Sequence, residues 1–375
     1  MKSNNSPINH PAKSANLAGT PINTALAILS TVIGAGFASG REVVEFFTRF
    51  GAFSWVGIAV AAACFAFLAA SIMKLSGRIG CGSWSDLAAA ALGKAGGAAA
   101  SALYAVIMII TASAMASGIG EVTAILLPVQ HARIIGTLAS VIICGFAATK
   151  GIRALAAGAS FLLPICILLY IVIGRTPAQT HALAMPLPNP IISIPYAIGY
   201  ACMNTTLCCC ILCEVGRTDE KRHKKISILF SIMLFILTAA CNAVLLPRLA
   251  QIVNEPLPIV KLSGGNTASM AFASASLLLA MATTLTALIR SVTQILTPKK
   301  ETRLPLKRKE RLRVPRIRAT YVRAPELIVP AICGALGLFE FNMLVGKAYP
   351  IMGYAAAAAL VIILAAGMRK LRSNK

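Results

Sequence analysis

The chain has 375 residues, of which 57% are hydrophobic and only 13% charged, and its mean hydropathy is +0.78. This composition excludes an ordinary soluble globular domain. The net charge of +23 would indicate nucleic-acid binding in a soluble protein. The positions of the basic residues along the chain therefore have to show whether they indicate nucleic-acid binding or the orientation of a membrane protein.

Residues 1–20 are polar and contain no apolar core of a signal peptide, so we expect a disordered cytoplasmic tail. Uncharged runs long enough to cross about 30 Å of hydrocarbon follow. These runs are too long for barrel strands and lack the alternation of polar and apolar residues that such strands show, which leaves helices as the spanning elements. We predict about ten spans, namely 22–40 (extended to about residue 50), 52–73, 98–127, 132–148, 154–173, 190–213, 226–247, 267–289, 326–345 and 349–367.

With the N-terminus inside the cell, the segments predicted to be cytoplasmic hold 28 of the 35 lysines and arginines. This bias places both termini in the cytoplasm. The most basic segment is the loop 290–325. We interpret it as a solvated linker attracted to anionic lipid headgroups. The alternative is an arm that binds RNA or a partner protein, but we expect no nucleic-acid partner.

The spans form a single transmembrane domain over residues 21–367, followed by a cytoplasmic tail at 368–375. They divide into two sets of five, 21–175 and 189–367. The first span of each set is interrupted: Gly34–Gly40 holds three glycines, each costing a helix about 1 kcal/mol relative to alanine, and 195–206 mixes glycine with polar residues. Paired interruptions indicate a binding site between inverted repeats. Close packing through small residues is the alternative.

A family resemblance is carried by three of the spans. The first contains TVIGAGFASGRE at residues 31–42, followed by EFF at 45–47. The sixth contains Tyr200 and Asn204, and the last begins with YPIMGY at 349–354. Together these segments resemble the YkvI-type membrane proteins over about residues 22–367, and that family resembles the amino acid-polyamine-organocation transporters.

The resemblance implies an all-α membrane protein with a LeuT-like 5+5 inverted repeat and discontinuous helices 1 and 6. It also implies a prokaryotic plasma-membrane protein that carries a small amino-acid-like solute coupled to Na+ or H+. Fold alone does not identify the solute. The rival interpretations are a transporter-like solute sensor without flux and a channel. The sequence indicates no oligomeric state.

The two interruptions supply the candidate solute site. Carbonyls at the end of a broken half-helix suit a cation, and amides at the start of the next suit a carboxylate. In the first span these would be 30–33 and 40–42; in the sixth span they would be 196–199 and 204–206. The predicted solute-binding residues are Gly34, Ala35, Gly36, Phe37, Ser39, Glu42, Tyr200, Asn204 and Thr205.

A Na+ site would use Ile33 together with Thr283 and Thr284 from the eighth span, the closest match to the paired hydroxyls of sodium-coupled relatives. The alternative is that each threonine hydroxyl bonds to a carbonyl of its own helix. No other cofactor is expected.

Acidic residues inside spans are costly and therefore functional candidates. Arg41, Glu45 and Arg49 are spaced four apart and predict a ladder of ion pairs, either structural or an extracellular gate. Glu42 lies on another face, where it would bind a substrate ammonium, relay a proton or remain a solvated carboxylate. Asn204 would contact solute or broken backbone, or hold two helices together.

Catalysis is not indicated. The four histidines lie in loops or tails, and there is no phosphate-binding Gly-Lys-Ser/Thr motif. The cysteines are scattered along the spans, so we expect no disulfide framework. Those at 208–210 and Cys213 either bind a soft metal or pack between helices.

Overall fold

The computed structural model describes residues 20–150, 189–297 and 324–373, together with Leu168, Tyr170, Ile171, Ile173 and Gly174. Within these residues every regular element is helical. The elements are α1 (Pro21–Val32), α2 (Ala35–Ala38), α3 (Arg41–Phe46), η1 (Thr48–Phe53), α4 (Ser54–Ile79), α5 (Trp84–Leu126), α6 (Ala132–Lys150), η3 (Pro190–Ile192), α8 (Ser193–Leu207), α9 (Cys209–Gly216), α10 (Glu220–Leu245), η4 (Leu246–Arg248), α11 (Leu249–Ile252), α12 (Pro258–Ser263), α13 (Thr267–Leu296), α14 (Pro325–Gly337), α15 (Phe341–Met343), η5 (Leu344–Ala348) and α16 (Tyr349–Ser373).

Six helices of the described part are long and apolar enough to cross a membrane, and the bent pair α8 and α9 makes up to seven. Two shorter apolar helices, α1 and α14, coincide with the starts of the predicted first and ninth spans. The predicted fifth span, 154–173, lies almost entirely outside the described residues. The all-helical, multi-pass class is confirmed, while the count of ten spans and the inverted repeat stay predictions.

The interruption predicted in the first span is present. Helix α1 ends at Val32, the short helix α2 follows, and α3 starts after Gly40. Gly40 has φ +82°, in the left-handed region, which glycine adopts without the strain of a side chain. The chain thus enters α3 through a turn that the glycine-rich sequence permits.

The interruption predicted in the sixth span was placed wrongly. Helix α8 runs without a break through 196–206, and the chain bends by 64° at Cys208, where α9 begins. A Cβ built on Gly353 of α16 would lie 2.6 Å from the carbonyl oxygen of Gly199. Glycine therefore lets α8 and α16 pack backbone to backbone, which is the small-residue alternative, and the carbonyls of 196–199 stay inside an intact helix.

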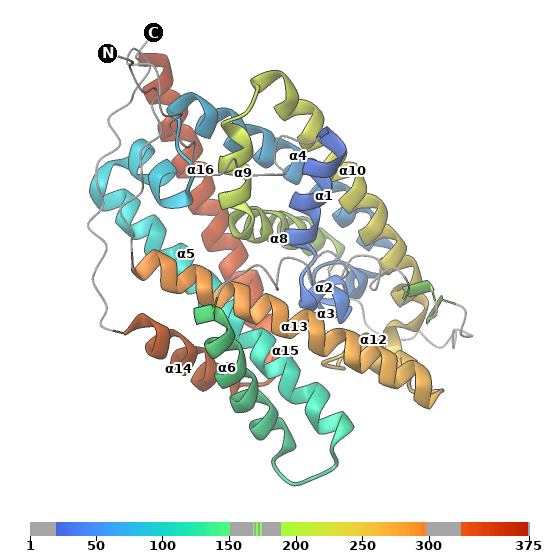
Figure 1. The fold of residues 1–375 in the computed structure, drawn as a ribbon. Helices are drawn as coiled ribbons and strands as arrows, with labels where there is room; N and C mark the ends of the chain where they lie inside the picture. The colour runs from blue at the N-terminus through green and yellow to red at the C-terminus, as the bar shows by residue number, and fades with distance from the viewer. Residues whose placement is uncertain are drawn as a thin grey trace, which may run out of the picture.

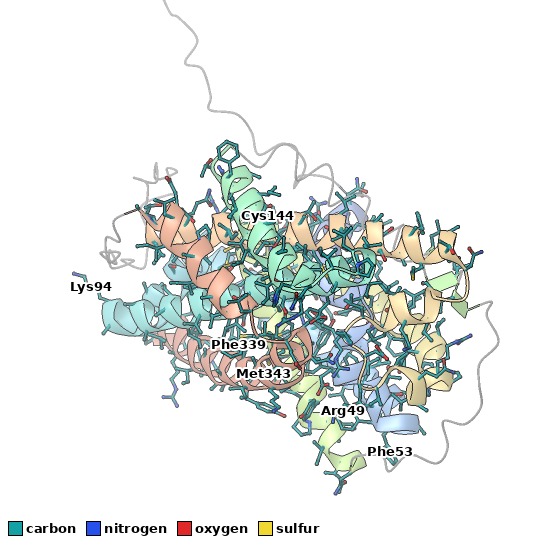
Figure 2. All side chains as sticks on the ribbon, turned by 90° about the horizontal axis from the view of Figure 1, so that it is seen from below. Arg49, Phe53, Lys94, Cys144, Phe339 and Met343 are labelled. Carbon is teal, nitrogen blue, oxygen red and sulfur yellow. The ribbon has the colours of Figure 1, made fainter. Side chains whose placement is uncertain are left out.

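Helix α8 lies at the centre of the molecule between α4 and α16 (Figure 1). On another side, α13 packs across α5 and α6, and α2 of the broken first span contacts α13. Lys94 of α5 and the residues Arg49 and Phe53 of η1 lie on opposite sides of the view in Figure 2. The broken segment therefore packs against helices of the second predicted half, namely α8, α10 and α13.

Candidate functional site

The backbone of the broken first span is buried, and its polar groups are satisfied by other parts of the chain. The Ser39 carbonyl accepts a hydrogen bond from the Ile259 amide at 3.1 Å, and the Phe37 carbonyl accepts one from the Tyr170 hydroxyl at 3.2 Å. Irregular backbone at membrane depth is tolerated where protein surrounds it in this way. The tertiary structure thus stabilises the break.

The individual break residues have different surroundings. Phe37 is completely buried in the core. The Ser39 hydroxyl donates to the Gly36 carbonyl at 2.8 Å and accepts from the Arg41 amide at 3.2 Å. That amide, expected to face a solute carboxylate, is therefore already paired. Gly34 and Gly36 line the break, and Ala35 begins α2.

Glu42 is the acidic group closest to this break. Its side chain is 6% exposed, and its Oε2 atom has no hydrogen-bond partner. A Cβ added to Gly36 would collide with the Glu42 carboxyl group, so the carboxyl occupies the space that the missing side chain leaves. Glu42 is therefore a buried carboxyl held against the short helix α2 of the broken span, and the interpretation as a solvated vestibule residue is wrong.

A neighbouring face of α3 carries the ladder that the spacing predicted. Glu45 accepts a hydrogen bond from Arg41 at 2.9 Å through one carboxylate oxygen, and its other oxygen pairs with Arg49. Arg41 also donates to the Val253 carbonyl at 2.7 Å. The ladder therefore binds α3 to the chain that follows α11, a contact that spacing alone did not indicate.

The α8 residues lie close to the same region. The ring of Tyr200 contacts those of Phe46 and Phe47, each with a centroid distance of 5.1 Å. Asn204 donates from Nδ2 to the carbonyl of Tyr200 at 3.1 Å, one turn back in its own helix, and not to broken backbone. The hydroxyl groups of Tyr200 and Thr205 are buried without a partner. Both hydroxyls are thus available to bind a ligand.

The residues proposed for Na+ separate into two kinds. The Thr283 hydroxyl donates to the carbonyls of Leu279 and Ala280 in its own helix, as the alternative interpretation states. Thr284 faces the break, because its Cγ2 lies 4.0 Å from a Cβ built on Gly34. Ile33 is buried just after α1. Of the two threonines, Thr284 is therefore the one whose side chain, through its methyl group, lies next to the break.

An acidic residue of α5 and the cysteines of α9 complete the set of notable side chains. Glu121 of α5 lies 3.9 Å from Arg133 and is partly exposed. The Sγ atoms of Cys209 and Cys213 lie 3.8 Å apart. Among the described residues, no group of three His, Cys, Asp or Glu side chains is arranged to hold a metal ion. Of the cysteines of α9, Cys209 and Cys213 are buried and Cys210 is exposed.

Tyr349 is a site residue that sequence reasoning missed. It opens α16, is fully buried, and its hydroxyl has no partner. Its hydroxyl and that of Tyr200 both interact electrostatically with Glu42. The signal available in the sequence was a tyrosine at the start of the last span, inside the YPIMGY segment that carried part of the resemblance.

Residues 20–188 match a protein-family model described as "Spore germination protein". The chain is 27% identical over 228 residues to the uncharacterized membrane protein YkvI of Bacillus subtilis (strain 168), covering 59% of this chain and 65% of the relative. The structure is similar to the inward facing conformation of Mhp1, with a TM-score of 0.57 and 15% identity over 92% of this chain and 75% of that chain. The chain is thus a multi-pass membrane protein that is similar to YkvI and shares the LeuT-like fold of Mhp1.

Proposed function

We propose that the protein is a secondary active transporter that moves a small amino-acid-like solute across a prokaryotic plasma membrane, coupled to Na+ or H+. The observation that carries this proposal is the buried break of the first span with an unpaired carboxyl group, Glu42, packed against Gly36. Ionisable groups inside membrane helices are costly and mark solute or ion pathways. The fold shared with Mhp1 and the matched family support the transporter class.

The proposed solute site lies between the broken span and α8. Its backbone part is the broken segment Gly34–Ser39, which includes the short helix α2, and its side chains are Glu42, Tyr200, Asn204 and Thr205. A carboxylate, free hydroxyls and irregular backbone together offer acceptors for an ammonium group and donors for a carboxylate. Such a set suits a small zwitterion.

Two positions are available for the coupling ion. Thr284 and the chain at Ile33 lie beside the break and would offer oxygen ligands to Na+, with Thr283 one residue away. If the coupling ion is H+, the carboxyl group of Glu42 would bind it. In the proposed topology both termini are cytoplasmic, and the basic loops contact anionic headgroups.

A transporter-like sensor that binds the solute without flux is the second candidate. The match to a family described as spore germination protein favours it, because germination is a response to a condition and does not itself require accumulation of a solute. Flux measurements separate the two candidates.

The test is uptake of a mixed panel of radiolabelled amino acids into proteoliposomes under imposed Na+ or H+ gradients. We expect gradient-driven accumulation that is lost in Gly36→Leu, because the added side chain displaces the Glu42 carboxyl. Gly265→Leu is the matched control, since nothing lies within 4 Å of that glycine's added Cβ. Binding without accumulation would favour the sensor, and the absence of both would contradict the proposal.

A further inference from the structure

Three buried oxygen atoms without hydrogen-bond partners converge on the broken first span. They are Oε2 of Glu42 on α3, the hydroxyl of Tyr200 on α8 and the hydroxyl of Tyr349 at the start of α16. Glu42 is 6% exposed, Tyr200 is 1% exposed and Tyr349 is 0% exposed. Buried polar groups are normally paired, so a cluster of unpaired ones requires a reason. Reversible binding of a proton or a cation by one of these groups is one such reason.

The charges around Glu42 leave it without a counter-ion. No ion pair involves Glu42 among the described residues, and both nearby arginines are directed to Glu45. Lys347 on η5 is exposed. The titratable groups that face Glu42 from the packed elements are Tyr200 of α8 and Tyr349 of α16, with Cys241 of α10 next to Tyr200.

An enclosed carboxyl group in this position is stable when it is neutral or when a cation joins it, because an isolated carboxylate in an apolar interior is very costly. A proton needs no space beyond the carboxyl group itself. Na+ or a substrate ammonium would need α3, α8 and α16 to separate first, since the Glu42 carboxyl already fills the side-chain space of Gly36. The enclosure therefore favours a proton as the occupant.

We propose that Glu42 binds the proton that drives transport, with the nearby Tyr200 and Tyr349 hydroxyls available to pair with its carboxyl group when the packed helices move. This inference rests on the proposed function and assigns its coupling ion. A phenol hydroxyl donates to a carboxylate and accepts from a carboxylic acid, so both tyrosines can serve either state. One O–H bond forms on Glu42 when a proton arrives from water on one side, and it breaks when the proton leaves to the other.

The position of Glu42 links this proton to the movement of the helices. Its carboxyl contacts Gly36 in the short helix α2, and its own helix, α3, follows α2 after only Ser39 and Gly40. Loss of the proton leaves a buried charge that favours separation of the packed helices and entry of water. Uptake of the proton favours the closed packing seen here. The protonation state thus selects between two arrangements of the break.

The first experiment detects the proton without any solute. Purified protein in lipid nanodiscs is titrated with pH while infrared difference spectra record the C=O stretch of protonated carboxyl groups. We expect one band that is lost in Glu42→Gln, shifted in Glu42→Asp, and shifted again in Tyr200→Phe and Tyr349→Phe. Glu121→Gln, at a partly exposed carboxylate, should leave that band unchanged. A Glu42→Gln spectrum identical to that of the unmodified protein would overturn the proposal.

The second experiment measures coupling in proteoliposomes with the radiolabelled amino-acid panel. We expect a pH gradient to drive accumulation in the unmodified protein and in Glu121→Gln, and Glu42→Gln to abolish that accumulation. Accumulation driven by a Na+ gradient at equal pH, or by a pH gradient in Glu42→Gln, would overturn the proposal and leave the proposed function standing. If no solute moves under any gradient, the proposed function fails, and the infrared titration still decides whether Glu42 binds a proton.

Discussion

The two glutamates of α3 show opposite ways of keeping an acid inside a membrane protein. Glu45 is paired through both carboxylate oxygens, one with Arg41 and one with Arg49. Glu42, three residues earlier, has an oxygen without any partner and faces two tyrosine hydroxyls. The paired glutamate is part of the structure that holds α3 in place, and the unpaired one is available to change its charge. We call Glu45 with its two arginines the anchor of α3, and we call Glu42 the switch.

The largest expected effect comes from the anchor. Glu45→Gln leaves the buried Arg41 guanidinium without its counter-ion, and breaking a buried pair typically costs about 3–5 kcal/mol. The free energy of unfolding should fall by that amount in mixed micelles titrated with SDS. Glu121→Gln, whose arginine partner lies at 3.9 Å and partly exposed, should lose about 0–1 kcal/mol. Equal small losses in both variants would show that the ladder does not stabilise α3.

The next effect tests the contact between the switch and the break. Gly36→Ala forces its Cβ into the Glu42 carboxyl and should lower the free energy of unfolding by about 1–3 kcal/mol. Glu42→Ala should remove much of that cost, giving a coupling of about 0.5–3 kcal/mol in a double-mutant cycle. Additive effects of the two substitutions would mean that the carboxyl does not rest on Gly36.

A smaller effect is expected at the outer end of the ladder. The side chain of Arg49 is 33% exposed, so water screens its pairing with Glu45. Arg49→Gln should lower the free energy of unfolding by about 0–1 kcal/mol, and the loss should shrink as salt concentration rises. A loss as large as that of Glu45→Gln would place Arg49, and not Arg41, at the centre of the anchor.

The smallest effect on stability is expected at the switch itself. Glu42→Gln keeps the shape of the side chain and breaks no ion pair, so the free energy of unfolding should change by about 0.5 kcal/mol or less. The same SDS titration measures it. Strong destabilisation would reveal that Glu42 has a structural partner and would remove the contrast with Glu45.

The sequence predicted the local features of this site and missed those that depend on distant packing. The ladder of Arg41, Glu45 and Arg49 was predictable because residues four apart share one face of a helix. The break after Val32 was predictable because three glycines weaken a helix. The sixth span misled because Gly199 has two possible uses, as a helix breaker or as a contact surface. The structure shows the second use, because Gly353, more than 150 residues later in the chain, packs against Gly199.

From the sequence alone follow the membrane class, the helical character of the spans, the resemblance to YkvI-type proteins and the interruption of the first span, because composition and short-range spacing encode them. Only the tertiary structure decided that Glu42 is enclosed, that Tyr349 joins Tyr200 beside it, and that Thr284 rather than Thr283 faces the break. These contacts join α3, α8, α13 and α16 across the length of the chain. Helical periodicity gives the face on which a side chain lies, but not which distant helix packs against that face.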